Sequence, residues 1–208
     1  MLRQGCILLA GLLLAGCKTA GPDLAPLVQI APASCNGTLD IGQALPLPFD
    51  AESKNKPTSI IVDEGSACFA EDNRKSLYRV FALPEHSQPF MLTVQSEPSS
   101  SSILAPRLIM LDGEGVRLRE IGYDEFLFRG NALSAIFRTE PGERYMIVAS
   151  DPEQVGSEVS RIGGSVQTQM MTTGVATFAV HTGSESTANL TYAHNGVVNV
   201  SARPIPTR

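Results

Sequence analysis

From residue 60 onward, apolar side chains recur at about every second position in short runs that are separated by turn residues. A period near two predicts β-strands with one buried face. Asp112–Gly115, Glu140–Glu143 and Glu185–Thr187 predict turns between neighbouring strands. With no alternation of strands and helices, the pattern predicts a mainly β fold, an antiparallel β-sandwich of jelly-roll or immunoglobulin-like topology. The predicted strands are 60–62, 77–83, 90–96, 108–111, 116–121, 132–138, 144–150, 174–180, 189–193 and 197–201.

One segment departs from this period and predicts a short helix near residues 152–162. Asp151 is a favourable N-cap, Pro152 suits the first helical position, and the pair of glycines after Ile162 would end the helix. Val155, Val159 and Ile162 have the spacing of one helix face, so this helix would pack on a sheet.

The N-terminus carries a targeting signal. A positive charge at Arg3 precedes about ten apolar residues, 6–15, which are too few to span a bilayer but suit the apolar region of a secretory signal peptide. The tetrapeptide Leu14-Ala15-Gly16-Cys17 resembles the lipobox of bacterial lipoproteins. The resemblance implies removal of residues 1–16 and attachment of a diacylglycerol and a further fatty acyl chain such as palmitate to Cys17, which anchors the protein stably in a membrane.

The residue after the lipidated cysteine predicts the destination. In enteric-type bacteria an aspartate at that position retains a lipoprotein in the inner membrane, and this chain has Lys18. By resemblance to that sorting rule we expect an outer-membrane lipoprotein that faces the periplasm. The proline-rich residues 17–34 predict a tether, and residues 35–208 predict a single domain that begins with an extended arm, 35–59.

Two cysteines remain for the folded part once Cys17 is acylated. In an exported chain, Cys35 and Cys68 predict a disulfide that closes a loop of about 33 residues and stabilises the fold by about 3 to 4 kcal/mol. The alternative is two unpaired thiols that are buried as small apolar side chains.

Composition argues against several kinds of chemistry. The 16 Lys and Arg against 21 Asp and Glu leave a formal charge of −5, which disfavours a nucleic-acid partner. The three histidines are isolated and no metal-spaced cysteine pair occurs, so neither a metal nor a cofactor is expected. Asp63-Glu64 and Glu71-Asp72 suggest either a calcium site or a solvated acidic loop. The serines at 99–102 have no evident base to activate them, which favours a flexible solvated loop.

The aromatic residues Tyr123, Phe126 and Phe128 are the candidate binding patch. If they are exposed they form a platform for a ligand, and if they are buried they belong to an ordinary strand. Sugar-binding sites usually use exposed aromatic side chains, and this chain contains no tryptophan.

The segments 77–81, 90–94 and 105–112, followed by the strand at 144–148 and the predicted helix from Asp151, resemble the maltose operon periplasmic protein family. The resemblance covers roughly residues 75–180. It implies a periplasmic protein with no known enzymatic activity, although this chain departs from the family by carrying a lipobox.

A second resemblance rests on Tyr78-Arg79-Val80, Leu111-Asp112-Gly113 and 142–148, which are similar to the pre-peptidase C-terminal type of bacterial β-sandwich. This second resemblance implies the fold and little about function.

Three functions are therefore open. The first is a non-enzymatic accessory or adaptor in envelope assembly or solute uptake, including maltodextrin uptake, with another envelope protein as partner. The second is a carbohydrate- or glycan-binding module. The third is a hydrolase, which would require a cleft where a serine, a histidine and a carboxylate converge.

Overall fold

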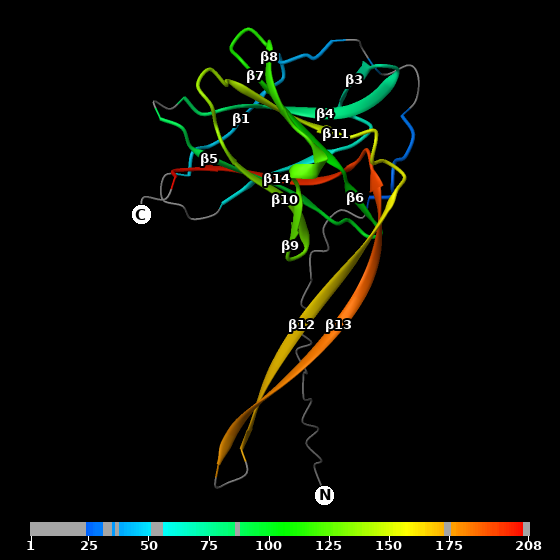
Figure 1. Cartoon of the computed structure of the whole chain (residues 1–208), viewed down its shortest axis with the longest axis vertical. Helices are drawn as coiled ribbons and strands as arrows, with labels where there is room; N and C mark the ends of the chain where they lie inside the picture. The colour runs from blue at the N-terminus through cyan, green and yellow to red at the C-terminus, as the bar shows by residue number, and fades with distance from the viewer. Residues whose placement is uncertain are drawn as a thin grey trace, which may run out of the picture.

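The computed structural model describes residues 24–30, 35, 38–50, 56–85, 88–172 and 176–205. Figure 1 shows a layered body of strands from which one long pair of strands projects. The elements are β1 Leu45–Pro46, β2 Thr58–Val62, β3 Ala67–Glu71, β4 Arg74–Ala82, β5 Met91–Glu97, β6 Ser102–Leu104, β7 Pro106–Leu111, β8 Arg117–Ile121, the 3-10 turn η2 Tyr123–Glu125, β9 Leu127–Arg129, β10 Ala132–Arg138, β11 Tyr145–Ser150, β12 Glu158–Thr172, β13 Thr177–Ala193 and β14 Gly196–Arg203.

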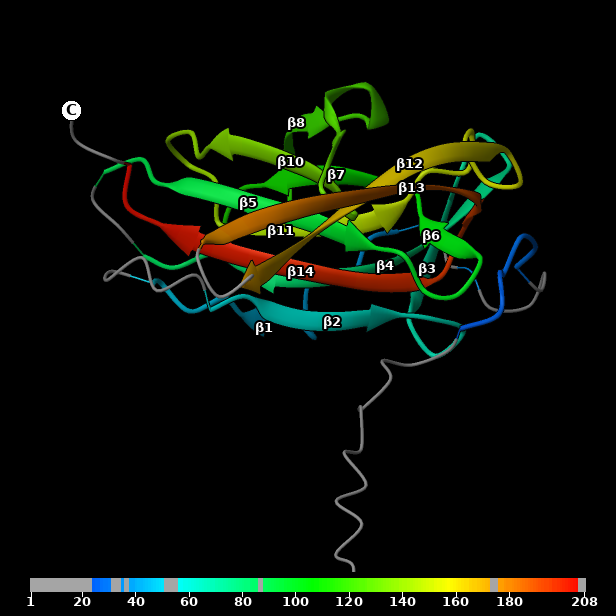
Figure 2. The same cartoon turned by 90° about the horizontal axis from the view of Figure 1, so that it is seen from below.

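The body is a β-sandwich, which confirms the predicted fold class. One sheet has the order β1-β4-β11-β7-β8, with β3 also paired to β4, and the other has the order β2-β14-β5-β10-β9. Figure 2, seen from below, shows β4 and β11 lying behind β5 and β14. Within the described residues the strand pairs are antiparallel, except that β1 runs parallel to β4 and β6 runs parallel to β13.

The period-two pattern places the main core between the two sheets. On β5, Leu92 and Val94 are fully buried, and they face side chains of the opposite sheet such as Phe81 and Met146 in one apolar cluster. Burial of each such side chain stabilises the fold by about 1.5 to 3 kcal/mol. This core is the reason why alternation along the sequence predicted most strands of the sandwich.

A second apolar layer covers the outer face of the first sheet. Phe69, Tyr78 and Ile109 belong to it, and Leu39 and Ile41 of the N-terminal arm pack against it. The backbone N–H of Asp40 donates a hydrogen bond of 2.8 Å to the Tyr78 hydroxyl. The arm therefore provides the second cover that a strand with two apolar faces requires.

The predicted helix near residues 152–162 is wrong, because this segment is a turn followed by a strand. Asp151 does cap the turn, since its carboxylate accepts the backbone N–H of Glu153 at 3.0 Å. The turn ends at Gly156, whose φ of +88° is incompatible with a continuing helix, and β12 begins at Glu158. Pairing along the whole of β13 supplies the backbone hydrogen bonds that a short helix would otherwise have made.

β12 and β13 form a long two-stranded ribbon, hereafter the ribbon. It is paired antiparallel from Glu158 opposite Thr191 to Thr172 opposite Thr177. The turn predicted at Glu185–Thr187 lies inside β13 instead. Figure 1 shows the ribbon extending away from the sandwich, and β6 pairs with its end at residues 191–193.

The serine-rich segment 99–102 is ordered, contrary to the predicted flexible loop. Ser99 and Ser102 are buried and exchange backbone hydrogen bonds of 2.9 and 3.0 Å. β6 follows directly and passes very close to β14, where a Cβ on Gly196 would lie 2.7 Å from the Cβ of Leu104. Only glycine allows this approach.

Candidate functional site

Residues Leu24–Ile30, hereafter the docking segment, bind at the root of the ribbon. The Leu24 N–H donates to the Ser99 hydroxyl at 3.0 Å, and the Leu27 N–H donates to the side-chain oxygen of Asn195 at 2.8 Å. In return, the Asn195 amide donates to the carbonyl of Ala25 at 2.7 Å, and the His194 N–H donates to the carbonyl of Leu27 at 2.8 Å. Residues 24–30 of the predicted tether thus lie against the domain, while its residues 17–23 and 31–34 lie outside the described residues.

The root of the ribbon is tied into the sandwich by several further contacts. The N–H of Thr191 donates to the carbonyl of Ser101, and the N–H of Gly156 donates to the carbonyl of Tyr192. The Tyr192 and Tyr123 hydroxyls share a hydrogen bond of 2.5 Å, and their rings meet edge to face. Burial, with the Tyr123 hydrogen bond, raises the pKa of Tyr192 well above its usual range. The ribbon therefore leaves the domain from a firmly held base.

The side chains of the candidate aromatic patch pack against the core, which agrees with the buried alternative. Phe126 is buried, and Tyr123 and Phe128 are partly buried and pack against the main core. The exposed apolar side chain in this stretch is Leu127, on the outward face of β9. The alternation of β9 directs Phe128 inward because burial of a phenyl ring outweighs burial of a neighbouring leucine.

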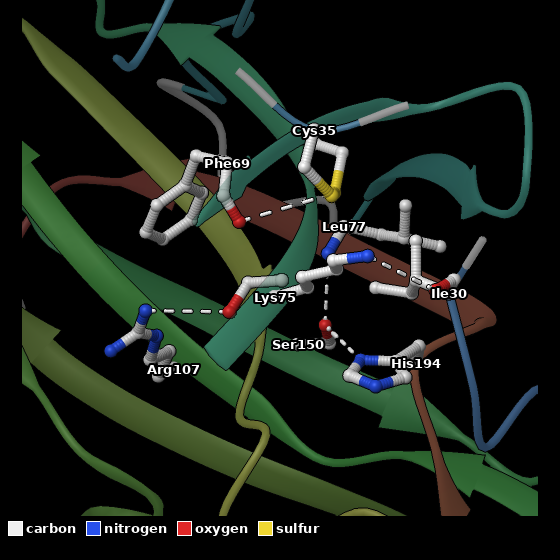
Figure 3. Close-up of a disulfide and its surroundings, with 10 residues drawn as sticks. Ile30, Cys35, Phe69, Lys75, Leu77, Arg107, Ser150 and His194 are labelled. Carbon is white, nitrogen blue, oxygen red and sulfur yellow. Dashed lines mark hydrogen bonds between the residues drawn. A yellow bond between two sulfur atoms is a disulfide. The ribbon is translucent and has the colours of Figure 1, made fainter. Parts of the chain in front are cut away.

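A serine and a histidine lie side by side beneath the docking segment. Figure 3 shows the Ser150 hydroxyl between the His194 ring and the Leu77 backbone, at 2.8 Å from His194 Nδ1 and 3.0 Å from the Leu77 nitrogen. The Leu77 N–H donates to the Ser150 oxygen, while Ser150 is fully buried. A nucleophile must be accessible to its substrate, and the hydroxyl of Ser150 is fully buried, so this pair favours a structural role over the hydrolase hypothesis.

His194 makes stability dependent on pH. Burial lowers its pKa to about 4, whereas an unfolded chain would bind the proton near pH 6.5. The unfolded state therefore binds more protons between these values. We expect the free energy of unfolding to be constant above pH 7 and to fall by about 3 kcal/mol as the pH drops to 4.

The measurement is denaturant unfolding at pH 7, 5.5 and 4 for the wild type and for His194→Gln. Glutamine does not titrate, so the variant should lose less stability than the wild type over this range. Equal losses in the two proteins would contradict the assignment to His194.

One member of each acidic pair is used within the fold. Asp63 accepts the N–H of Gly65 in its own turn, and Glu71 pairs with Arg117 at 2.7 Å and with Arg107 at 3.4 Å. Burial raises the pKa of Glu71, but the hydrogen bond and charge of Arg117 and the charge of Arg107 outweigh it and lower this pKa. Among the described residues, no group of three or more histidine, cysteine or acidic side chains is arranged to hold a metal ion.

A shallow cavity of about 240 Å³ lies beside the turn between β10 and β11. Its walls include Pro84, Phe90, Thr139 and Arg144, and Phe90 is itself buried. Drug-sized ligands usually occupy cavities of about 300 to 1,000 Å³ that are rich in exposed apolar surface. A more open cavity of about 440 Å³ beside Leu27 and Asn195 does fall within that range, so it is the burial of the candidate aromatic patch that argues against the glycan-binding hypothesis.

Large exposed apolar side chains lie near one another at the tip of the ribbon, which comprises residues 170–172 of β12 and 177–179 of β13. Met170 is 72% exposed, Met171 is 51% exposed, and Phe178, which pairs with Met171, is 46% exposed. Sequence reasoning missed this feature. A usable signal was present, because no Lys, Arg, Asp or Glu occurs between Arg161 and Glu185.

The predicted signal peptide and the predicted acylation site at Cys17 lie outside the described residues, as does His86. No helix in the described part of the chain is long and apolar enough to cross a bilayer.

The chain was compared with protein-family models, with curated proteins and with solved structures, and no match was found. The resemblance to the maltose operon periplasmic protein family therefore stays a prediction.

Proposed function

We propose that this chain is an outer-membrane lipoprotein that acts without catalysis, as a periplasm-facing adaptor in envelope assembly or solute uptake. One observation carries the proposal: the docking segment, which begins seven positions after the predicted acylated Cys17, binds at the root of the projecting ribbon. The chain that leads to the anchor is therefore held at the root of the ribbon, so attachment to the membrane determines where the ribbon lies relative to the bilayer.

The form of the ribbon supports a binding role. It is a long strand pair whose described residues pair with another element only near the root, through β6. Isolated two-stranded hairpins are marginally stable in water, and exposed strand edges readily pair with other chains. A protein that maintains such an element in the periplasm is suited to bind an envelope protein along the shaft, which is the part of the ribbon between its root and its tip.

In-cell photocrosslinking tests the adaptor role. A photoreactive amino acid in place of Thr187, exposed on the shaft, should capture one discrete envelope protein, and the same group in place of Val116 on the sandwich should not. Equal, diffuse crosslinking at both positions would contradict the proposal. Calorimetric heat on titration with maltodextrins or peptidoglycan fragments would replace it with the glycan-binding function.

A further inference from the structure

The ribbon changes in character from root to tip. Near the root the exposed surface is polar, since Ser160 bonds to Asn189 and Arg161 bonds to Asn131. Beyond Arg161 charged residues cease until Glu185, and the exposed apolar side chains Met170 and Met171 lie close to the end of β12. The ribbon is thus amphipathic along its length.

The apolar side chains are present on both faces of the tip. Successive residues of a strand point to opposite faces, so Met170 lies on one face and Met171 with its cross-strand neighbour Phe178 on the other. A protein surface that docks on a ribbon covers one face or one edge. An apolar medium that surrounds the tip would cover both faces, and the interface of a bilayer is such a medium.

Chain lengths allow the tip to reach the membrane that carries the anchor. Six residues lie between Cys17 and Leu24, so Leu24, seven positions further along the chain, lies at most about 25 Å from the acylated residue. β12 has 15 residues, and at about 3.3 Å per residue the ribbon is about 50 Å long. Because the root lies so close to the bilayer and the ribbon is twice as long as that distance, the tip can touch the surface when the whole domain tilts.

Charge and backbone chemistry limit how the tip can bind. The chain as a whole carries a formal charge of −5, which an anionic phospholipid surface repels, whereas the tip carries none. Hydrocarbon does not tolerate an open strand edge, so the ribbon cannot cross the bilayer alone. The last three register pairs, from Met170 opposite Ala179 to Thr172 opposite Thr177, span roughly 10 Å, which matches the depth of the interfacial layer.

From these observations we infer that Met170, Met171 and Phe178 insert into the interfacial layer of the phospholipid bilayer in which the acylated Cys17 is anchored. The inference rests on the proposed lipid anchor, which confines the tip near the surface and so makes even a weak insertion effective. Two points of attachment about 50 Å apart would hold the sandwich in one orientation on the membrane.

The test uses the processed, full-length lipoprotein in vesicles of phosphatidylethanolamine and phosphatidylglycerol. A polarity-sensitive fluorophore is attached to Ala179→Cys at the tip or to Thr187→Cys on the shaft, both exposed positions of β13. Lipids that carry a nitroxide near the headgroup should quench the tip fluorophore several-fold more than the shaft fluorophore. Equal quenching at the two positions would overturn the inference.

Substitutions test which side chains insert the tip into the bilayer. Met170→Ser/Met171→Ser/Phe178→Ser should reduce quenching of the tip fluorophore to the shaft level, because each apolar side chain contributes about tenfold to partitioning. The control Leu127→Ser/Ile136→Ser removes exposed apolar surface from the sandwich and should leave tip quenching unchanged. A tip that forms crosslinks to a second copy and is not quenched by the lipid would assign the apolar surface to a protein contact and overturn the inference.

The mass of the same purified protein shows whether it is acylated, which distinguishes a failure of this inference from a failure of the proposed function. If the mass shows acyl groups and the tip fluorophore is not quenched, the anchor is supported and the insertion is rejected. A quenched tip on a chain without acyl groups would support the insertion and reject the anchor.

Discussion

Cys17→Ala should abolish acylation and cleavage before residue 17, and the processed, membrane-bound form should disappear. The reason is that in the proposed lipoprotein the Cys17 thiol accepts the diacylglycerol, and each buried CH₂ of the acyl chains would stabilise membrane association by about 0.8 kcal/mol. No other group in the docking segment can replace two acyl chains. The measurement is intact-protein mass spectrometry together with separation of membrane and soluble fractions.

The matched control is Cys6→Ala. Cys6 lies in the apolar part of the predicted signal peptide and leaves with it, so this variant should be processed, acylated and retained like the wild type. A Cys17→Ala protein that still appears in the membrane as a processed species would show that the lipid anchor is wrong.

Removal of the disulfide should produce the largest loss of stability. Cys35 and Cys68 are joined, 33 residues apart, which confirms the predicted bridge. On the chain-entropy model, Cys35→Ser/Cys68→Ser lowers the free energy of unfolding by about 3 to 4 kcal/mol. Denaturant unfolding of the acylated protein in detergent measures the change, and equal midpoints for variant and wild type would contradict it.

The bridge also affects the candidate site. Cys35 follows the docking segment, and Cys68 lies on β3 opposite Leu77 of β4. Figure 3 shows Cys35 close to Ile30, whose carbonyl accepts a hydrogen bond of 3.4 Å from Lys75. Without the bridge, the docking segment should exchange its Leu27 amide hydrogen faster than the wild type, while amides in the centre of β5 remain protected.

The predicted turns and strands show which structure was accessible from local sequence. β10 occupies 132–138 as predicted, because its alternating side chains face a core on one side. The turn at Asp112–Gly115 joins β7 to β8, with the Asp112 carboxylate accepting the N–H groups of Glu114 and Val116. In these places the local pattern and the tertiary contacts favour the same conformation.

The ribbon shows where local reasoning failed. Asp151 and Pro152 are typical of a helix start, and the turn that they form is real, but pairing with β13 decided the continuation. β3, β6 and β9 were also missed because each is short, at 5, 3 and 3 residues. Strand pairing is a contact between distant residues, and a short segment contains little information about its partner.

The sequence by itself determined the class of the fold, the cysteines available for pairing and the expectation of an anchored, exported chain. Each follows from chemistry within a few residues: alternation, a thiol that follows small residues, and turn-forming glycines. Only the tertiary structure decided that Tyr123, Phe126 and Phe128 belong to the core, that residues 24–30 dock, and that Met170 lies at an exposed tip. Burial and exposure are properties of the surroundings, and for these residues the surroundings come from strands far away along the chain.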